Sequence, residues 1–294
     1  MCLYLKNNKL VKEGDWKKSI SKLKTTSLIN NKEIMIDYIK RDLTEAIDKL
    51  LPKERFGILF SGGIDSTLIA YVCKYKLKKQ FTCYTVGTKD SEDIAWAKKI
   101  AKHYKFRNKV KIIDEKEAER IIKKTAKILG KKVSNPVNVG VGSVEVAALE
   151  LAKKDRIKYL FGGLGSEELF AGYQRHELAK DINRECLTGL KKMWQRDLLR
   201  DAKISEYFKI KFFAPFLDEF LIKTAMMIPG EYKIKDKHKK YILRLVAQNI
   251  GIKKDFAFRK KRAAQYGSNF DKMLEKVSRK RGFKYKSDYL KSLA

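Results

Sequence analysis

The sequence has few cysteines, histidines and prolines. Its 294 residues include four cysteines, three histidines and four prolines. No two cysteines are spaced as CxxC, and His103, His176 and His238 are scattered along the chain. A Cys/His zinc site and a disulfide framework therefore have no support. We expect His103 and His176 to be surface residues.

Long apolar runs are also missing. No run approaches the ~20 residues that a helix needs to span a bilayer. Residues 1–6 lack the charged start and the apolar core of a signal peptide. We therefore expect a cytoplasmic protein with no membrane partner. A hydrophobic fraction of 44% in a chain of this length favours a folded protein of one or two domains.

Acidic residues are scarce relative to basic ones. The chain has 67 Lys and Arg against 35 Asp and Glu, which gives 67 − 35 = +32. A polyanionic partner such as RNA would account for this excess. The alternative is a set of lysines spread over solvated faces, where the charge has no specific partner. Composition leaves both interpretations open.

Strand and helix patterns alternate in the first 175 residues. Short apolar runs predict strands at 56–60, 81–86, 110–113 and 157–161. Helices are expected at 33–51, 67–78, 116–129 and 143–151, with another beginning at Ser91. Residues 139–143, which include two glycines, are expected to form a loop. This alternation predicts an α/β fold with a parallel, doubly wound sheet.

The remainder of the chain reads as helical. No strand pattern follows Tyr173, and helices are expected at 178–207, 217–227 and 241–250. We divide the chain into a basic N-terminal arm or docking element (1–32), a central domain (33–270) and a basic C-terminal tail (271–294). The central domain comprises an α/β nucleotide-binding part (33–175) and a helical part (176–270).

Residues 60–67 form a glycine-containing turn between a strand and a helix. Free N–H groups and the positive end of a helix suit a phosphate group, and Ser66 is the expected N-cap. Asp65 is a poor direct phosphate contact, but it fits a site in which Mg²⁺ bridges the acid to polyphosphate. The turn is no Walker loop, because Gly-Lys-Ser/Thr does not follow at the required spacing.

The segment 61–66, Ser-Gly-Gly-Ile-Asp-Ser, resembles the PP-loop of the ATP pyrophosphatases. In that superfamily the loop holds the β- and γ-phosphates while ATP is cut between its α- and β-phosphates. The resemblance implies a fold of this type and ATP as the nucleotide. The nucleotide-binding residues that it implies here are Phe60, Ser61, Gly62, Gly63, Asp65 and Ser66.

A second glycine-rich loop follows the fourth predicted strand. Residues 163–173 resemble the GxGxDElFgGY motif of asparagine synthetases. Other pieces of that family's pattern follow the same order over roughly residues 35–270. They are Val86-Gly87, Asp93 with Ala97, the segment 215–218 (Pro-Phe-Leu-Asp), Lys240 with Leu243-Arg244, and Arg259 with Lys261.

This resemblance implies roles at matching positions. Val86, Gly87, Gly163 and Lys240 would join the nucleotide site. Asp65 and Glu167 would bind Mg²⁺, and Lys261 would neutralise the departing pyrophosphate as a catalytic residue. Glu168 is a further catalytic candidate, although an acid at a helix start also serves the helix alone. Arg244 would meet either phosphate or an acid on a neighbouring helix.

The chain departs from the family pattern at several positions. Leu164 replaces a glutamate that serves the amide-forming half of the reaction, and Glu167 replaces an aspartate. Phe213-Ala214 stands where the family has an arginine. Cys2 occupies the position of the family's glutaminase nucleophile, but we interpret it as coincidence or relic because about thirty residues hold no glutaminase domain. Nitrogen would then come from ammonia, a separate glutaminase or an amine on the substrate.

The expected function is an ATP-dependent, AMP- and pyrophosphate-forming amide ligase. It would adenylate a small carboxylate and transfer the acyl group to ammonia or another amine. One alternative is a PP-loop enzyme that adenylates a tRNA base, which the excess positive charge favours. Another is a non-catalytic partner subunit that retains nucleotide binding.

Overall fold

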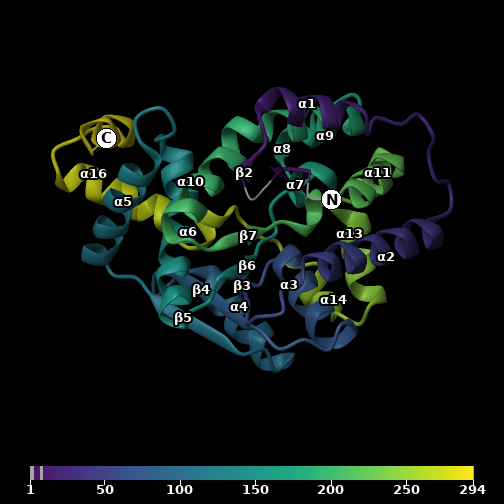
Figure 1. Cartoon of the computed structure of the whole chain (residues 1–294), viewed down its shortest axis with the longest axis horizontal. Helices are drawn as coiled ribbons and strands as arrows, with labels where there is room; N and C mark the ends of the chain where they lie inside the picture. The colour runs from purple at the N-terminus through teal and green to yellow at the C-terminus, as the bar shows by residue number, and fades with distance from the viewer. Residues whose placement is uncertain (1–2, 7–8, 294) are drawn as a thin grey trace.

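The computed structural model describes residues 3–6 and 9–293, and its centre is one parallel sheet (Figure 1). The spatial order of the five strands is β5-β4-β3-β6-β7, and each neighbouring pair is parallel. The strands are β3 (Gly57–Leu59), β4 (Thr82–Gly87), β5 (Asn108–Ile112), β6 (Tyr159–Phe161) and β7 (Lys211–Phe213). The predicted α/β fold with a parallel sheet is confirmed.

Helices surround this sheet on both faces. The long helices before β6 are α1 (Glu13–Ser21), α2 (Lys32–Leu50), α3 (Ile64–Tyr71), α4 (Glu92–His103), α5 (Glu115–Leu129) and α6 (Pro136–Lys154). Those after it are α9 (Ile182–Met193), α10 (Leu199–Phe208), α11 (Glu219–Met227), α13 (Tyr241–Asn249), α16 (Phe270–Lys280) and α17 (Lys286–Leu293). Single helical turns are α7 (Ser166–Leu169), α8 (Gln174–Glu177), α12 (Gly230–Lys233), α14 (Lys254–Ala257) and α15 (Ala264–Gly267). No helix of the described residues is long and apolar enough to cross a bilayer.

The alternation of side chains along the strands builds two cores. Ile58 and Cys83 point into a core that α2, α3 and α4 share, whereas Tyr84 and Leu160 point into a core with α5 and α6. Successive strand residues face opposite sides of a sheet, so a sheet buried on both faces needs apolar residues at nearly every position. This requirement explains why the predicted strands read as continuous apolar runs.

Two expectations about secondary structure were wrong. The edge strand β7 was missed, because it begins with an exposed lysine and its two phenylalanines are only half-buried, unlike the buried apolar runs of β3 and β6. Residues 139–143 lie inside α6 rather than in a loop. A side chain at Gly142 would lie 3.0 Å from Thr125 Cγ2 and 3.1 Å from Ile204 Cδ1. The glycine therefore serves close packing of α6 against α5 and α10.

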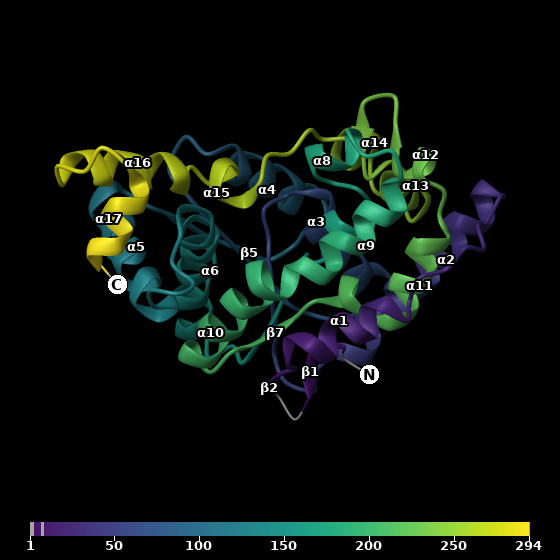
Figure 2. The same cartoon turned by 90° about the horizontal axis from the view of Figure 1, so that it is seen from above.

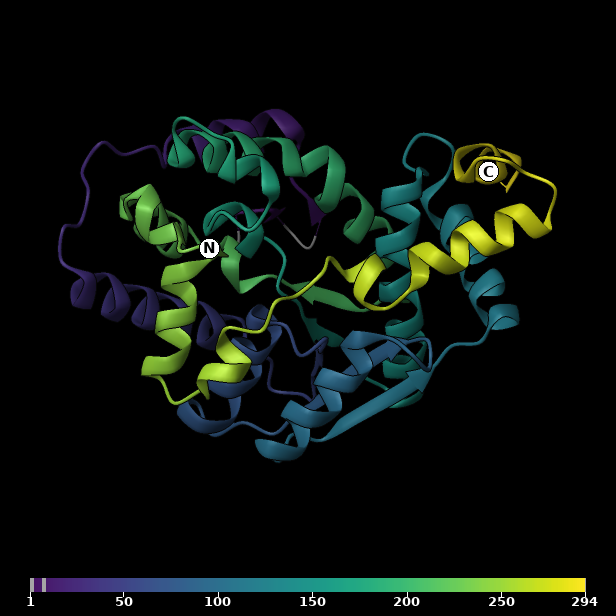
Figure 3. The same cartoon turned by 180° about the vertical axis from the view of Figure 1, so that it is seen from behind.

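Both terminal segments contribute to the cores. Helix α1 packs beside α9 (Figure 2), and the buried Trp16 donates a hydrogen bond from Nε1 to the carbonyl of Leu190 at 2.8 Å. Helix α16 packs against α5 and α6 (Figure 3), and Leu274 and Tyr289 near the C-terminus are buried. Apolar contacts thus join the N-terminal and C-terminal segments, which were predicted to lie outside the central domain, to its cores.

Candidate active site

The two glycine-rich loops leave neighbouring strands at the centre of the sheet. Strands β3 and β6 are adjacent and parallel, and the chain continues outward in opposite directions from them, to β4 and β5 on one side and β7 on the other. The carboxyl ends at such a switch point form the crevice in which open α/β sheets bind ligands. Residues 61–66 follow β3, and residues 162–168 follow β6.

The turn after β3 approaches α4 closely at Gly62. This residue has a φ of +64°, and a Cβ there would lie 2.9 Å from the backbone nitrogen of Ala97. Only glycine fits both the conformation and the space. We predicted Ser66 as the N-cap of α3, but Gly63 occupies that position. The Ser66 hydroxyl instead braces the turn, donating to the carbonyl of Gly63 at 3.2 Å and accepting from the N–H of Ser61 at 3.4 Å.

A buried lysine links the two loops. The ammonium of Lys240 lies 2.9 Å from both carboxylate oxygens of Asp65 and 2.7 Å from Glu167 Oε1. It also donates to the Ser166 hydroxyl at 3.1 Å. Lys240 begins α13 with a left-handed φ of +56°, an uncommon conformation for lysine that recurs at functional sites. The four residues come from three segments far apart in the sequence.

Charge pairing controls ionisation in this cluster. Burial alone raises the pKa of Asp65, but the ammonium groups of Lys240 and Lys261 outweigh it, and the pKa lies below its usual value. Burial likewise lowers the pKa of Lys240, whereas Asp65 and Glu167 raise it above its usual value. Both groups are therefore charged at neutral pH, and the carboxylate oxygens remain acceptors.

Two further glycines allow the loops to meet. A Cβ on Gly163 would lie 2.7 Å from the Cβ of Asp65. A Cβ on Gly172 would overlap the Glu167 carboxylate and lie 2.6 Å from Lys240 Cε. Larger residues at either position would push apart the groups that form the cluster.

The segment between α14 and α15 lies against the PP-loop, and Figure 3 shows this segment as the stretch of chain that leads to α15 and α16. A Cβ on Gly63 would lie 2.5 Å from Lys261 Cδ, so the lysine side chain rests on the loop. Arg259 donates to the carbonyl of Ser61 at 2.9 Å and to Asp93 at 2.9 Å. Arg259 was not selected as a site residue, although it belongs to a segment with family resemblance, and it fixes the loop from outside.

Glu168 faces away from this cluster. It forms an ion pair with Arg196, and its side chain lies close to Gly189 of α9. Burial, with the nearby charges of Asp197 and Glu167, raises the pKa of Glu168 to about 7 despite Arg196. Adjacent residues on a helix point about 100° apart, so Glu167 reaches Lys240 while Glu168 reaches α9.

The end of β4 also lies at this edge. Val86 is buried, and a Cβ on Gly87 would lie 2.5 Å from the Ser91 hydroxyl. Thr88, the next residue, donates from its N–H to the carbonyl of Ser268 at 3.1 Å. These contacts join the end of β4 to the residue that follows α15, and no hydrogen bond or ion pair joins Val86 or Gly87 to Asp65 among the described residues.

The prediction of a surface position for His176 was wrong, and Arg244 forms no ion pair with an acid among the described residues; its contact with phosphate stays a prediction. Arg244 donates to the carbonyls of Lys239, Ala257 and Arg259 at 2.8, 2.6 and 3.2 Å. It thereby supports the segment that carries Lys261. His176 is fully buried, and its Nδ1 accepts from the N–H of Tyr173 at 3.1 Å. Burial lowers the pKa of His176 to about 4, so the ring is neutral.

Three of the positions that depart from the family pattern, Leu164, Phe213 and Ala214, carry apolar side chains. Leu164 is half-buried and packs against the first core. The Phe213 ring stacks on Tyr159 of β6 with centroids 5.7 Å apart, and Ala214 is buried. Cys2, the other position of interest, lies outside the described residues.

Comparison with known proteins agrees with the order of these motifs. The family model described as asparagine synthase matches residues 39–181 and 176–287, which is most of the chain. The chain belongs to the asparagine synthase family. A Methanocaldococcus jannaschii protein assigned as asparagine synthetase (glutamine-hydrolyzing) 1 is 31% identical over 96% of this chain. Asparagine synthetase (glutamine-hydrolyzing) of Gallus gallus is 26% identical over 74% of it.

The family members are longer than this chain. The aligned region spans 58% of the M. jannaschii protein and 41% of the G. gallus protein. Among solved structures, the NAD⁺ synthetase of Burkholderia pseudomallei matches 92% of this chain and 97% of its own, with 13% identity and a TM-score of 0.35. That likeness is too low to bear on function.

Proposed function

We propose that this chain is an ATP-dependent carbon–nitrogen ligase that releases AMP and pyrophosphate. A substrate carboxylate oxygen attacks the α-phosphorus of ATP, and the bond to the bridging oxygen of pyrophosphate breaks. An amine then attacks the acyl-adenylate carbonyl, AMP leaves, and an amide forms. Family membership supports the reaction class, and the observation that carries the proposal is the convergence of Asp65, Glu167, Lys240 and Lys261 on the PP-loop.

The donor set at the loop fits Mg²⁺. Asp65 and Glu167 direct carboxylate oxygens toward one cation position, at which the Lys240 ammonium lies. Mg²⁺ prefers oxygen ligands and binds through one or two carboxylates together with substrate phosphates. No group of three or more potential metal-binding side chains occurs in the described residues, so the substrate would supply the other ligands. When bound, the metal would neutralise charge on the leaving pyrophosphate.

The residues of the chain have separate tasks in this proposal. The turn at residues 61–63 and the start of α3 would bind the terminal phosphates. Lys261, which lies over Gly63, stabilises the negative charge that builds on pyrophosphate as it leaves. Arg259 holds the loop through the Ser61 carbonyl. Glu168 acts as a positioning residue, since it contacts Arg196 and not the loop.

We propose that the acceptor half differs from asparagine formation. Leu164 stands where the resemblance places a glutamate, and a leucine can neither accept a proton nor pair with an ammonium ion. Phe213 and Ala214 likewise place no guanidinium near the substrate carboxylate. The nitrogen donor would be free ammonia, a separate glutaminase or an amine on the substrate.

The test is to identify the products of ATP turnover. The full chain is incubated with α-labelled ATP and Mg²⁺, and amino acids and other small carboxylates are offered with and without ammonia. AMP and pyrophosphate in equal amounts would support the proposal, and the stimulating carboxylate would identify the substrate class. ADP with phosphate, or no turnover with any carboxylate, would contradict it and favour a non-catalytic nucleotide-binding subunit.

A matched pair of variants makes this test specific to the site. Glu167 and Glu168 are neighbours of the same residue type, but only Glu167 contacts Lys240. Glu167→Gln should lower pyrophosphate release at subsaturating Mg²⁺, and added Mg²⁺ should restore part of it. Glu168→Gln should leave the Mg²⁺ dependence unchanged. An equal Mg²⁺ dependence in both variants would argue against Glu167 as a metal ligand.

A further inference from the structure

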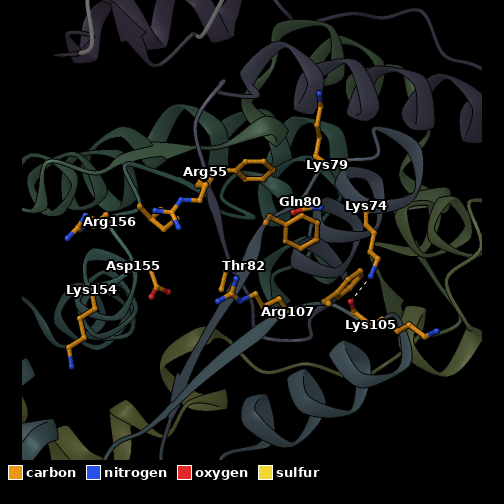
Figure 4. A pocket seen from close by; sticks show the side chains of 14 residues that line it. Arg55, Lys74, Lys79, Gln80, Thr82, Lys105, Arg107, Lys154, Asp155 and Arg156 are labelled. Carbon is orange, nitrogen blue, oxygen red and sulfur yellow. Dashed lines mark hydrogen bonds between the residues drawn. The ribbon is translucent and has the colours of Figure 1, made fainter.

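A basic recess lies at the opposite edge of the sheet, where the strands begin. The recess has a volume of about 550 Å³ and is bordered by the residues that precede β3, β4, β5 and β6 (Figure 4). The recess therefore lies at the edge of the sheet opposite the PP-loop, and none of the residues of the candidate active site lines it.

The lining of the recess is more basic than the chain as a whole. Among the described residues that line it, seven are Lys or Arg and one is acidic, whereas the chain has 67 basic and 35 acidic residues. That acid, Asp155, is already paired with Lys109 and accepts a hydrogen bond from the Tyr84 hydroxyl. Six of the seven cations are exposed and form no ion pair with a described residue. They are Arg55, Lys79, Lys105, Arg107, Lys154 and Arg156.

The backbone turns at this edge repeat one cationic pattern. Lys78, Lys105, Arg156 and Lys209 precede β4, β5, β6 and β7, and each has a left-handed φ between 53° and 56°. Three of these turns close with the same bond, from Phe106 to Ala101, Ile157 to Ala152 and Ile210 to Ser205. Glycine or asparagine usually occupies such a position, because other residues are strained there. Every one of these four turns carries a lysine or arginine instead.

These cations form a row. Adjacent strands lie about 4.8 Å apart, so five strands give an edge about 19 Å long. Arg55 precedes the central strand β3 and fills the gap in the row. In spatial order across the sheet, the residues are Lys105, Lys78, Arg55, Arg156 and Lys209.

The arrangement of the row indicates the shape of its ligand. Figure 4 shows the labelled side chains spread across the recess rather than directed at one point. A compact anion would need convergent donors, whereas a chain of phosphates needs a row of them. Three arginines, which can bind phosphate with two hydrogen bonds, lie within this recess in a chain that has 14 arginines in total.

We propose that the row and its recess bind single-stranded nucleic acid. The concave shape admits one strand more readily than a duplex, and the half-buried ring of Phe81 in its lining offers a surface for a base. A membrane surface fits less well, because none of the described residues that line the recess is an exposed large apolar side chain. This binding site is independent of the ligase proposed for the opposite edge.

The experiment measures the binding of a labelled 12-nucleotide uridine strand to the full chain by fluorescence anisotropy over a range of salt concentrations. The test variant carries Arg55→Gln, Arg107→Gln and Arg156→Gln. The control carries Lys24→Gln, Arg184→Gln and Lys272→Gln, which remove the same charge from exposed cations outside both the row and the recess. All six positions are exposed, and circular dichroism checks that both variants fold.

We expect the test variant to bind at least tenfold more weakly at 100 mM salt, and the control to change less than about twofold. Loss of three phosphate contacts should reduce the slope of log K against log salt by about 2. Equal losses in both variants, or no loss in the test variant, would overturn the proposal. Tighter binding of a 12-base-pair duplex would overturn the single-strand assignment. If the test variant lost binding to phosphatidylserine vesicles but still bound the uridine strand, nucleic acid would be excluded as the ligand.

Discussion

The two edges of the central sheet carry charge in different arrangements. At the carboxyl edge, cations and acids are interlocked: Lys240 lies between Asp65 and Glu167, and Arg259 contacts Asp93. At the amino edge, exposed cations such as Arg55 and Arg156 form no ion pair with a described acid. Paired, buried charges have fixed positions and suit a reaction that needs exact placement of groups, whereas unpaired exposed cations suit a flexible polyanion.

The comparison teaches that the net charge of +32 is not one property with one cause. At the carboxyl edge, neighbouring acids offset the charge of the basic residues. The fixed positions of these groups therefore matter more there than their net charge. At the amino edge, the charge is uncompensated and acts over a distance set by salt, about 8 Å at physiological ionic strength. Predictions that separate the two edges can therefore test either one alone.

The largest effect is expected from Asp65→Asn. Removing this carboxylate takes away a proposed metal ligand and leaves Lys240 with one acid fewer, so pyrophosphate formation should fall by about 10³-fold or more. Breaking a buried ion pair should also lower the free energy of unfolding by about 3 kcal/mol. Initial rates and urea unfolding would measure the two effects. Near-normal turnover in a folded variant would refute the metal assignment.

Lys261→Ala is expected to lower pyrophosphate formation by about 100-fold, because its side chain lies over the PP-loop and would stabilise the leaving group. The neighbouring Lys260 is exposed and forms no ion pair with a described residue, so Lys260→Ala is the matched control and should change the rate less than about twofold. Steady-state rates at saturating ATP would compare them. Similar losses of rate in both variants would show that Lys261 contributes only general positive charge.

Gly172→Ala tests the fit between the two loops. A methyl group would overlap the Glu167 carboxylate and displace it from Lys240, so the rate should fall by roughly tenfold and the chain should lose about 1–3 kcal/mol of stability. The control is Gly14→Ala, since a Cβ on Gly14 of α1 meets nothing within 4 Å. Thermal unfolding and the apparent affinity for Mg²⁺ would report the change. An unaltered Mg²⁺ affinity would contradict a metal role for Glu167.

The raised pKa of Glu168 predicts how the stability of the fold changes with pH. Its pKa is raised to about 7 in the folded chain, so the folded state binds its proton more tightly than the unfolded state. The stabilisation is fully present below pH 4.5 and is lost as the pH rises to 7, a change of about 3 kcal/mol. Urea unfolding at pH 5 and pH 8 should show that Glu168→Gln loses less stability over this range than the wild type. Identical changes in both would exclude Glu168 as the source.

The smallest effect is expected on pyrophosphate formation when cations at the amino edge of the sheet are replaced. The variant with Arg55→Gln, Arg107→Gln and Arg156→Gln should form pyrophosphate at a rate within about twofold of the wild type, because none of these residues contacts the PP-loop cluster. A large loss of turnover in the folded variant would show that the two edges are coupled, and the contrast drawn between them would fail.

The pattern of apolar runs was enough to predict the sheet. Each of the four predicted strands occurs. Strands β3, β4 and β6 lie inside the sheet and are mostly buried, which requires apolar runs, whereas the edge strand β5 alternates polar and apolar residues. The other edge strand, β7, begins with an exposed lysine and is only half-buried, so its pattern carried little information. The glycines of α6 were misread as a loop for a related reason. Glycine in a sequence signals a special conformation or close packing, and only the neighbours Thr125 and Ile204 show which applies.

By itself, the sequence determined the fold class, the family and the glycine-rich loops, because these depend on residue order and local spacing. The tertiary structure alone decided that Lys240 lies between Asp65 and Glu167, although 175 residues separate Lys240 from Asp65. It also decided that Glu167 and Glu168 face opposite partners, and that cations from successive turns form one row. Distances between charges depend on packing, and no local pattern encodes which distant side chains will meet.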